Sequence, residues 1–133
     1  MELRNGALVA VVDGSHLKLF KNSGDAGSLK LTEQKTGDVS SENKGSTGHA
    51  SSSANPDDSQ QDEDSFAAGV AELLNKKALG GSLDQLVVIA APRTLGELRK
   101  HYHKTLSAKL AGEVAKDLTG HSLADIEKAV QSA

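Results

Sequence analysis

The N-terminal part of the chain places apolar residues at the spacing of β-strands. Residues 7–12 are apolar throughout, and residues 15–21 and 29–32 largely alternate apolar with polar side chains. Alternation with a period of two gives a strand one apolar and one polar face. Asp13-Gly14 separates the first two segments and is typical of a tight hairpin. This pattern predicts an antiparallel meander of three strands.

The following apolar residues have the spacing of an amphipathic helix. Phe66, Val70 and Leu74 recur on one helical face. Ser65 can cap the start of this helix, and the two glycines after Leu79 can end it. A helix is therefore predicted over residues 65–79.

A second apolar run leads directly into a helical pattern. Residues 86–91 are apolar without alternation, which is typical of a strand covered on both faces, as in a parallel sheet. Pro92 ends this run. Thr94 with Glu97 then matches the capping box of a helix that continues through Leu106.

Two more elements complete the order. Residues 112–118 fit a short strand, and Ser122 with Asp125 can cap a last helix. A meander followed by α-β-α-β-α predicts an α/β fold with a mixed five-stranded sheet and helices packed on it.

Residues 37–63 interrupt the pattern. Val39 is their only large aliphatic residue, and six acids against one lysine give the segment a formal charge of −5. This composition buries too little apolar surface to offset the entropy of ordering the backbone. We expect a single domain over residues 1–133, with residues 37–63 as a flexible polar and acidic insertion.

Composition excludes several classes of protein. The 133 residues contain no cysteine, which excludes disulfides, cysteine-ligated metals and thiol nucleophiles. Asp13 interrupts the N-terminal apolar run, which therefore does not fit a signal peptide, and no apolar run approaches the ~20 residues of a membrane span. We expect a monomeric cytoplasmic protein without membrane insertion, cofactor or metal.

Basic residues gather after the inner strand. Residues 92–109 carry a formal charge of +4, whereas the whole chain carries −3. Cations four residues apart on one helix share a face and can contact several phosphates. Ligands of open α/β sheets also bind outside the carboxyl ends of strands. The predicted nucleic-acid-binding residues are Arg93, Arg99 with His103, and Lys100 with Lys104. The alternative is a charged face that only contacts solvent.

Other candidate residues have weaker support. His49, in the insertion, could act as a general acid, a general base or a phosphate contact. His101 and His103, two residues apart on a helix, would point to different sides and could not share a metal ion. Asp13 could hold a metal, but the sequence favours its use in a turn.

Several motifs resemble a known family. Residues 86–99 read LVVIAAPRTLGELR, and Lys116-Asp117-Leu118-Thr119 follows. Phe66-Ala67 begins a helix after a polar loop with Gly48-His49-Ala50. On these motifs the chain resembles the bacterial host attachment protein family, which is similar to the middle domain of archaeal and eukaryotic peptide-chain release factors. The resemblance spans nearly the whole chain and implies an RNase H-like sheet.

This resemblance also implies a connection with the ribosome or tRNA. Release factors reach the peptidyl-tRNA ester with a Gly-Gly-Gln tripeptide, which this chain lacks; it has Gly45-Ser46-Thr47-Gly48-His49 instead. We therefore expect a non-catalytic module that binds the ribosome or a structured RNA. Two alternatives stay open: a hydrolase of peptidyl-tRNA esters that uses residues 45–49, and a protein-interaction factor that affects attachment to host cells.

Overall fold

The fold is built on one mixed β-sheet. The computed structural model describes residues 3–25, 27–36 and 57–133, and it describes residues 57–61 by their backbone alone. Five strands follow the order β3-β2-β1-β4-β5. The strands are β1 (Leu8–Val12), β2 (Leu17–Asn22), β3 (Leu31–Gln34), β4 (Leu86–Ala90) and β5 (Leu110–Val114). β1 to β3 pair antiparallel, whereas β4 pairs parallel with both β1 and β5, so the predicted mixed sheet is confirmed.

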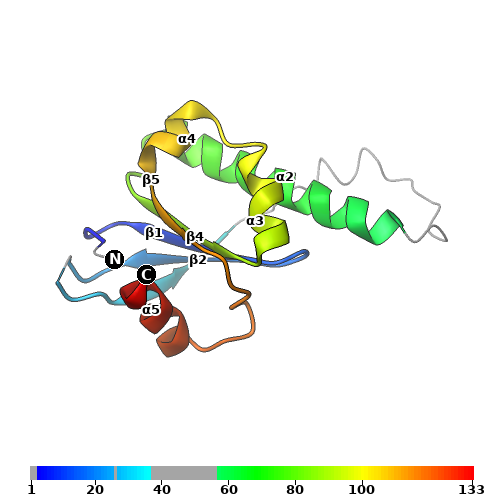
Figure 1. Ribbon diagram of the computed structural model, residues 1–133. Coiled ribbons are helices and arrows are strands. Elements are labelled where there is room, and N and C mark those ends of the chain that lie inside the picture. The colour runs from blue at the N-terminus through cyan, green and yellow to red at the C-terminus, as the bar shows by residue number, and fades with distance from the viewer. Residues whose placement is uncertain (1–2, 26, 37–56) are drawn as a thin grey trace.

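Helices cover both faces of the sheet. They are α2 (Asp57–Leu79), α3 (Pro92–Arg99), α4 (Lys104–Lys109) and α5 (Leu123–Ser132). Helices α2, α3 and α4 lie together on one face, and α5 lies on the opposite face (Figure 1). The two faces are called the α2 face and the α5 face below.

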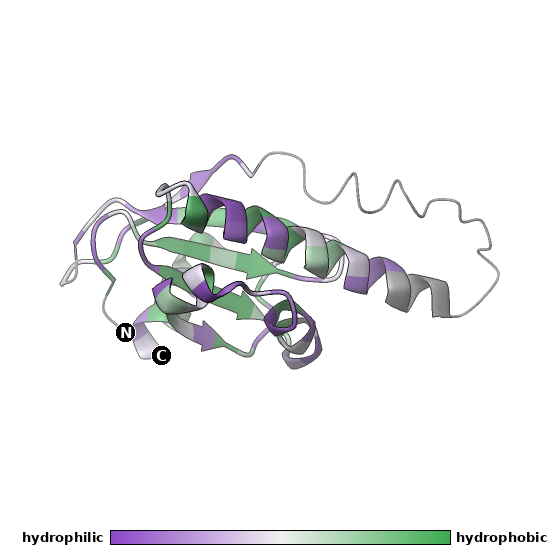
Figure 2. Cartoon of the chain, turned by 90° about the horizontal axis from the view of Figure 1, so that it is seen from above, coloured by the Kyte–Doolittle hydropathy of each residue, from purple (hydrophilic) through white to green (hydrophobic). Residues whose placement is uncertain are grey.

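An apolar cluster fills the space on each face. Alternate residues of β1 and β4 point toward the α2 face, where they pack with Val70 and Leu74. The remaining residues of these strands pack with Ile126 and Val130 on the α5 face. All five residues of β4 are buried, which confirms the predicted inner strand. Figure 2 shows the hydrophobic central strands, framed by polar loops.

The hairpin between β1 and β2 is fixed by Asp13. Its carboxylate accepts hydrogen bonds from the backbone N–H groups of Ser15 and His16, at 2.8 and 2.6 Å. The backbone N–H of Asp13 donates to the carbonyl of His16, so Gly14-Ser15 forms the centre of the turn, one residue later than predicted. The use of Asp13 in a turn is confirmed.

Helix α2 begins earlier than the sequence pattern predicted. It starts at Asp57 and not at Ser65. Residues 57–63, which the sequence assigned to the flexible insertion, are helical, and residues 37–56 lie outside the described residues. An acidic and serine-rich composition does not by itself exclude a helix, because helical stability depends mainly on the apolar face that packs, here from Phe66 onward.

The end of α2 and the start of α5, both predicted from local sequence signals, are confirmed. The backbone N–H of Ser82 donates to the carbonyl of Lys77, and Gly81 has a φ of +81°, the conformation that glycine adopts most easily at a helix end. At the start of α5, the Ser122 hydroxyl accepts from the backbone N–H of Asp125 at 3.2 Å.

The helix predicted from Thr94 to Leu106 is wrong. Helix α3 starts at Pro92 without a side-chain cap and ends at Arg99, and α4 starts only at Lys104. The capping box of Thr94 with Glu97 is therefore not formed at the helix start.

The break between α3 and α4 is held by a buried side chain of α2. The amide of Asn75, which is fully buried, donates to the carbonyl of His101 at 2.9 Å. Its oxygen accepts from the backbone N–H of His103 at 3.0 Å. Backbone groups that leave a helix must find other partners, and Asn75 supplies them here.

The last predicted strand is also displaced. Strand β5 ends at Val114, whereas the pattern predicted a strand over residues 112–118. Leu118 belongs to the connecting loop, and it is buried in the apolar cluster of the α5 face. Its burial explains why the segment looked like a strand.

Candidate functional site

The carboxyl ends of β1, β4 and β5 meet at one edge of the sheet. These three strands are parallel, so Asp13, Pro92 and Lys116 all follow the same edge. Ligands of open α/β sheets bind at such an edge. A ligand site is therefore expected among the side chains that follow these strand ends.

A hollow opens beside the start of α3. Its volume is about 370 Å³. It is lined by Asp64 of α2 and by Pro92, Arg93, Gly96, Glu97 and Lys100. Within residues 62–133, Arg93 is exposed and forms no hydrogen bond or ion pair with another side chain. The N-terminus of α3 has neither a side-chain cap nor an acid in its first turn.

Lys100, the second cation that lines the hollow, forms an ion pair with Glu97. Lys100 Nζ lies 3.1 Å from Glu97 Oε1, and His101 Nε2 lies 3.3 Å from Glu97 Oε2. The hydrogen bond from Lys100 lowers the pKa of Glu97 most, burial acts in the opposite direction, and His101 lowers it further. Glu97 therefore stays ionised and holds both Lys100, which lines the hollow with it, and His101.

Arg99 points to a different partner. Its Nε and one terminal nitrogen donate to Oε1 of Glu113 in β5, at 3.0 and 2.6 Å. The hydrogen bonds and the charge of Glu113 raise the pKa of Arg99. This ion pair joins the end of α3 to the outer strand of the sheet.

The five predicted nucleic-acid-binding residues are thus not one stripe. Arg93 and Lys100 line the hollow, and Arg99 pairs with Glu113. His103 and Lys104 are exposed at the start of α4, after the break. The continuous basic helix face was wrong because the helix ends at Arg99, but the role of each cation in binding stays a prediction.

A second polar cluster was missed by sequence reasoning. The hydroxyl of Thr119, in the loop after β5, lies 2.9 Å from Asp13 Oδ2 and 2.8 Å from Asp117 Oδ1. It has one hydrogen and donates to one of them at a time. His16 Nδ1 lies 3.2 Å from both oxygens of Asp13. The Lys116–Thr119 motif was noticed, but nothing local indicated that Thr119 would reach Asp13.

Asp13 is a stable carboxylate in this cluster. Burial would raise the pKa of Asp13, but the hydrogen bonds from Ser15, Thr119 and His16 outweigh burial and lower it. In the described ranges, no three histidine or acidic side chains are placed to hold a metal ion. The cluster therefore joins the hairpin after β1 to the loop after β5.

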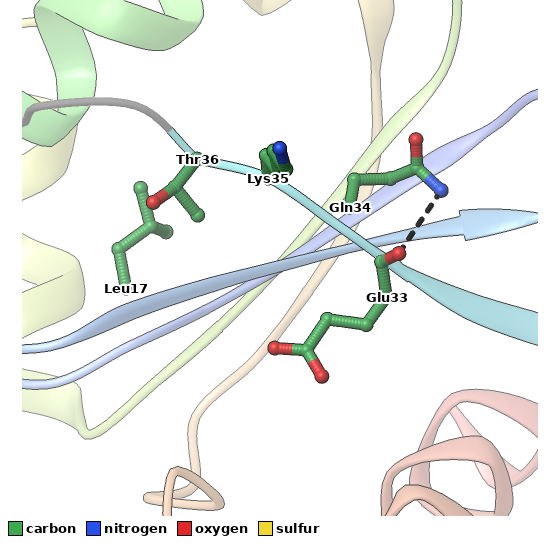
Figure 3. Close-up of a pocket in the computed structure, with 5 residues that line it drawn as sticks. All are labelled: Leu17, Glu33, Gln34, Lys35 and Thr36. Atoms are coloured by element: carbon green, nitrogen blue, oxygen red, sulfur yellow. Dashed lines mark hydrogen bonds between the residues drawn. The ribbon is translucent and has the colours of Figure 1, made fainter.

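A larger hollow lies beside the edge strand β3. Its volume is about 500 Å³, and it is lined by Leu17 of β2 and by residues 33–36 (Figure 3). Gln34 Nε2 donates to the carbonyl of Glu33, as the dashed line shows. Leu17 pairs with Val12, the last residue of β1, so this hollow lies on the antiparallel side of the sheet and shares no lining residue with the hollow beside α3.

A comparison with protein families identifies the chain. The family model for bacterial archaeo-eukaryotic release factor family 12 matches residues 6–130. The chain belongs to this family. The match supports the release-factor part of the resemblance, whereas the host attachment part stays a prediction. A search of curated proteins found no match to this family 12 member.

Two further predictions concern His49 and membrane insertion. His49 and residues 45–49, on which the hydrolase alternative depends, lie outside the residues that the structure of this family 12 member describes. No helix in the described part of the chain is long and apolar enough to cross a membrane.

Proposed function

We propose that this family 12 domain binds phosphates of ribosomal RNA or of another structured RNA, with Arg93 and the N-terminus of α3 as the main contact. The observation that carries the proposal is the exposed position of Arg93 at the carboxyl edge of the inner strand β4. A guanidinium can donate two parallel hydrogen bonds to a phosphate. The module is proposed to bind without catalysis.

The start of α3 supports the same ligand chemistry. Its first backbone N–H groups have no side-chain cap, and no acid occupies the first turn. Such groups carry partial positive charge and are suited to phosphate oxygens. Arg93 adds a full charge beside them, so the two features favour the same kind of group.

The acids that line the hollow limit the affinity expected for RNA. Asp64 and Glu97 line it together with Arg93 and Lys100, so the hollow has no large net charge. Binding should therefore be moderate and should weaken as salt increases. Membership of a release-factor family is the reason for preferring the ribosome as the RNA partner.

Charge reversal at Arg93 tests this proposal. We expect Arg93→Glu to reduce co-sedimentation with purified bacterial ribosomes at low salt by about tenfold or more, because a phosphate contact becomes a repulsion. Lys128→Glu is the matched control, since Lys128 is exposed on α5, on the opposite face. Equal co-sedimentation of the wild type and both variants would refute the proposal.

A further inference from the structure

The two side chains of the Arg99–Glu113 ion pair differ in their exposure to solvent. The side chain of Arg99 is 56% exposed, whereas that of Glu113 is 17% exposed. Both donor nitrogens of Arg99 converge on Oε1 of Glu113. The arginine can therefore reach solvent and ligands, while the carboxylate stays within the protein.

The second oxygen of Glu113 has no hydrogen-bond partner. Glu113 Oε2 is buried and, among the residues that the structure describes, unpaired. A buried charged oxygen without a donor is costly. Glu113 thus has the capacity to accept a hydrogen bond that Arg99 does not provide.

Tyr102 provides a second donor beside this pair. Its hydroxyl is also buried without a partner in the described part of the chain. Burial, and then the negative charge of Glu113, raise the pKa of Tyr102, while Arg99 opposes them. The phenol is therefore protonated, and it lies close enough to Glu113 for the charge of that carboxylate to raise its pKa. If Arg99 leaves, a hydrogen bond from Tyr102 can stabilise the charge of Glu113.

We propose that Glu113 competes with RNA phosphates for Arg99. The free protein holds Arg99 on Glu113, and a bound phosphate takes Arg99 over while Tyr102 donates to Glu113. This inference rests on the proposed function. Arg99 lies six residues after Arg93, about 9 Å along the helix axis and about 120° around it, so an RNA backbone that crosses over α3 can reach both arginines. The ion pair is then an internal brake on RNA binding.

Binding of a labelled RNA stem-loop over a range of salt concentrations tests the brake. Glu113→Gln should bind more tightly than the wild type. Its plot of log affinity against log salt should keep the slope of the wild type, because Arg99 contacts the same phosphate in both complexes. Glu127→Gln on α5 removes the same charge from the other face and is the matched control. Tyr102→Phe should weaken binding in the wild type and have no effect in Glu113→Gln.

The outcomes separate the two proposals. If the wild type loses binding through Arg93→Glu but Glu113→Gln leaves the affinity unchanged, the brake is refuted and the proposed function stands. Equal gains in Glu113→Gln and Glu127→Gln would also refute the brake, since they would reflect net charge alone. Absence of binding in both the wild type and Glu113→Gln would refute both proposals.

A measurement on the unaltered protein covers the case in which Glu113→Gln fails to fold. The Nε–H signal of Arg99 can be followed by NMR while the same stem-loop is added. A shift of this signal as RNA saturates the protein supports release from Glu113. An unchanged signal at saturation would overturn the inference.

Discussion

The two faces of the sheet are covered in different ways. On the α2 face, three helices bury a broad apolar cluster, and Asn75 satisfies the backbone where α3 and α4 separate. On the α5 face, one helix of ten residues covers a smaller cluster. Two polar contacts anchor that layer: Glu127 accepts from the Leu31 backbone N–H at 2.8 Å, and Thr119 reaches Asp13. A thick helical layer is held by burial, whereas a single helix and its loop need anchors.

The largest effect is expected from the apolar cluster of the α2 face. Leu74 is fully buried there, so Leu74→Ala should lower the free energy of unfolding by about 3 kcal/mol through lost burial and a cavity. Urea unfolding measures this change. Leu79→Ala is the control, because Leu79 lies on the same helix but is 64% exposed, and it should cost less than about 0.5 kcal/mol. Equal losses would contradict the description of this face.

On the same face, loss of the Asn75 hydrogen bonds should lower the free energy of unfolding somewhat less than Leu74→Ala does. Asn75→Ala leaves the carbonyl of His101 and the N–H of His103 without their partner and should cost about 2 kcal/mol in urea unfolding. Lys76→Ala changes an exposed neighbour and serves as the control. If Asn75→Ala were as stable as Lys76→Ala, the amide would not be what holds the break.

On the α5 face, Thr119 tests the first anchor. Thr119→Val keeps the shape but removes the hydroxyl that donates to Asp13, so it should cost about 1 kcal/mol. Thr119→Ser keeps the donor and should lose clearly less. Urea unfolding at neutral pH compares the two variants, and an equal loss would mean that the methyl group and not the hydroxyl anchors the loop.

The same variant should change the pH dependence of stability. The pKa of Asp13 is lower in the folded protein than in the unfolded chain. Its contribution to the free energy of unfolding is therefore complete above about pH 4 and is lost as the pH falls through the lowered folded pKa. Thr119→Val removes one of the lowering hydrogen bonds, so this acid loss should become smaller. An unchanged acid profile would argue against the Thr119–Asp13 contact.

The smallest effect concerns the second anchor. Glu127→Ala removes the acceptor of the Leu31 N–H and should change global stability by less than about 1 kcal/mol. The Leu31 amide should nevertheless exchange its hydrogen faster, because its opening becomes more frequent. Glu127→Gln retains an acceptor, so its Leu31 amide should exchange at a rate between those of the wild type and Glu127→Ala. Equal exchange in all three proteins would contradict the anchor.

Local signals were enough for much of the fold. The inner strand was predicted because six apolar residues without alternation need cover on both faces. The cap by Ser122 and the end of α2 before Gly80 and Gly81 were predicted because each depends on residues within one helical turn. These features can be read from the sequence because their causes lie beside them in the chain.

The errors have distant or ambiguous causes. The break after Arg99 contains neither proline nor glycine, and it depends on Asn75 in another helix. The pairing of Arg99 with Glu113 joins residues on different elements, so the sequence presented Arg99 as a free cation. Only Arg93 kept the exposed position at the strand end that the sequence predicted.

The most direct test of the account is the salt dependence of RNA binding. The affinity of the wild type, Arg93→Ala and Lys128→Ala for a labelled RNA stem-loop is measured over a range of salt concentrations. We predict that Arg93→Ala alone lowers the slope of log affinity against log salt by about 0.7 to 0.9, the loss of one phosphate contact. The same slope in all three proteins would contradict the claim that Arg93 contacts phosphate.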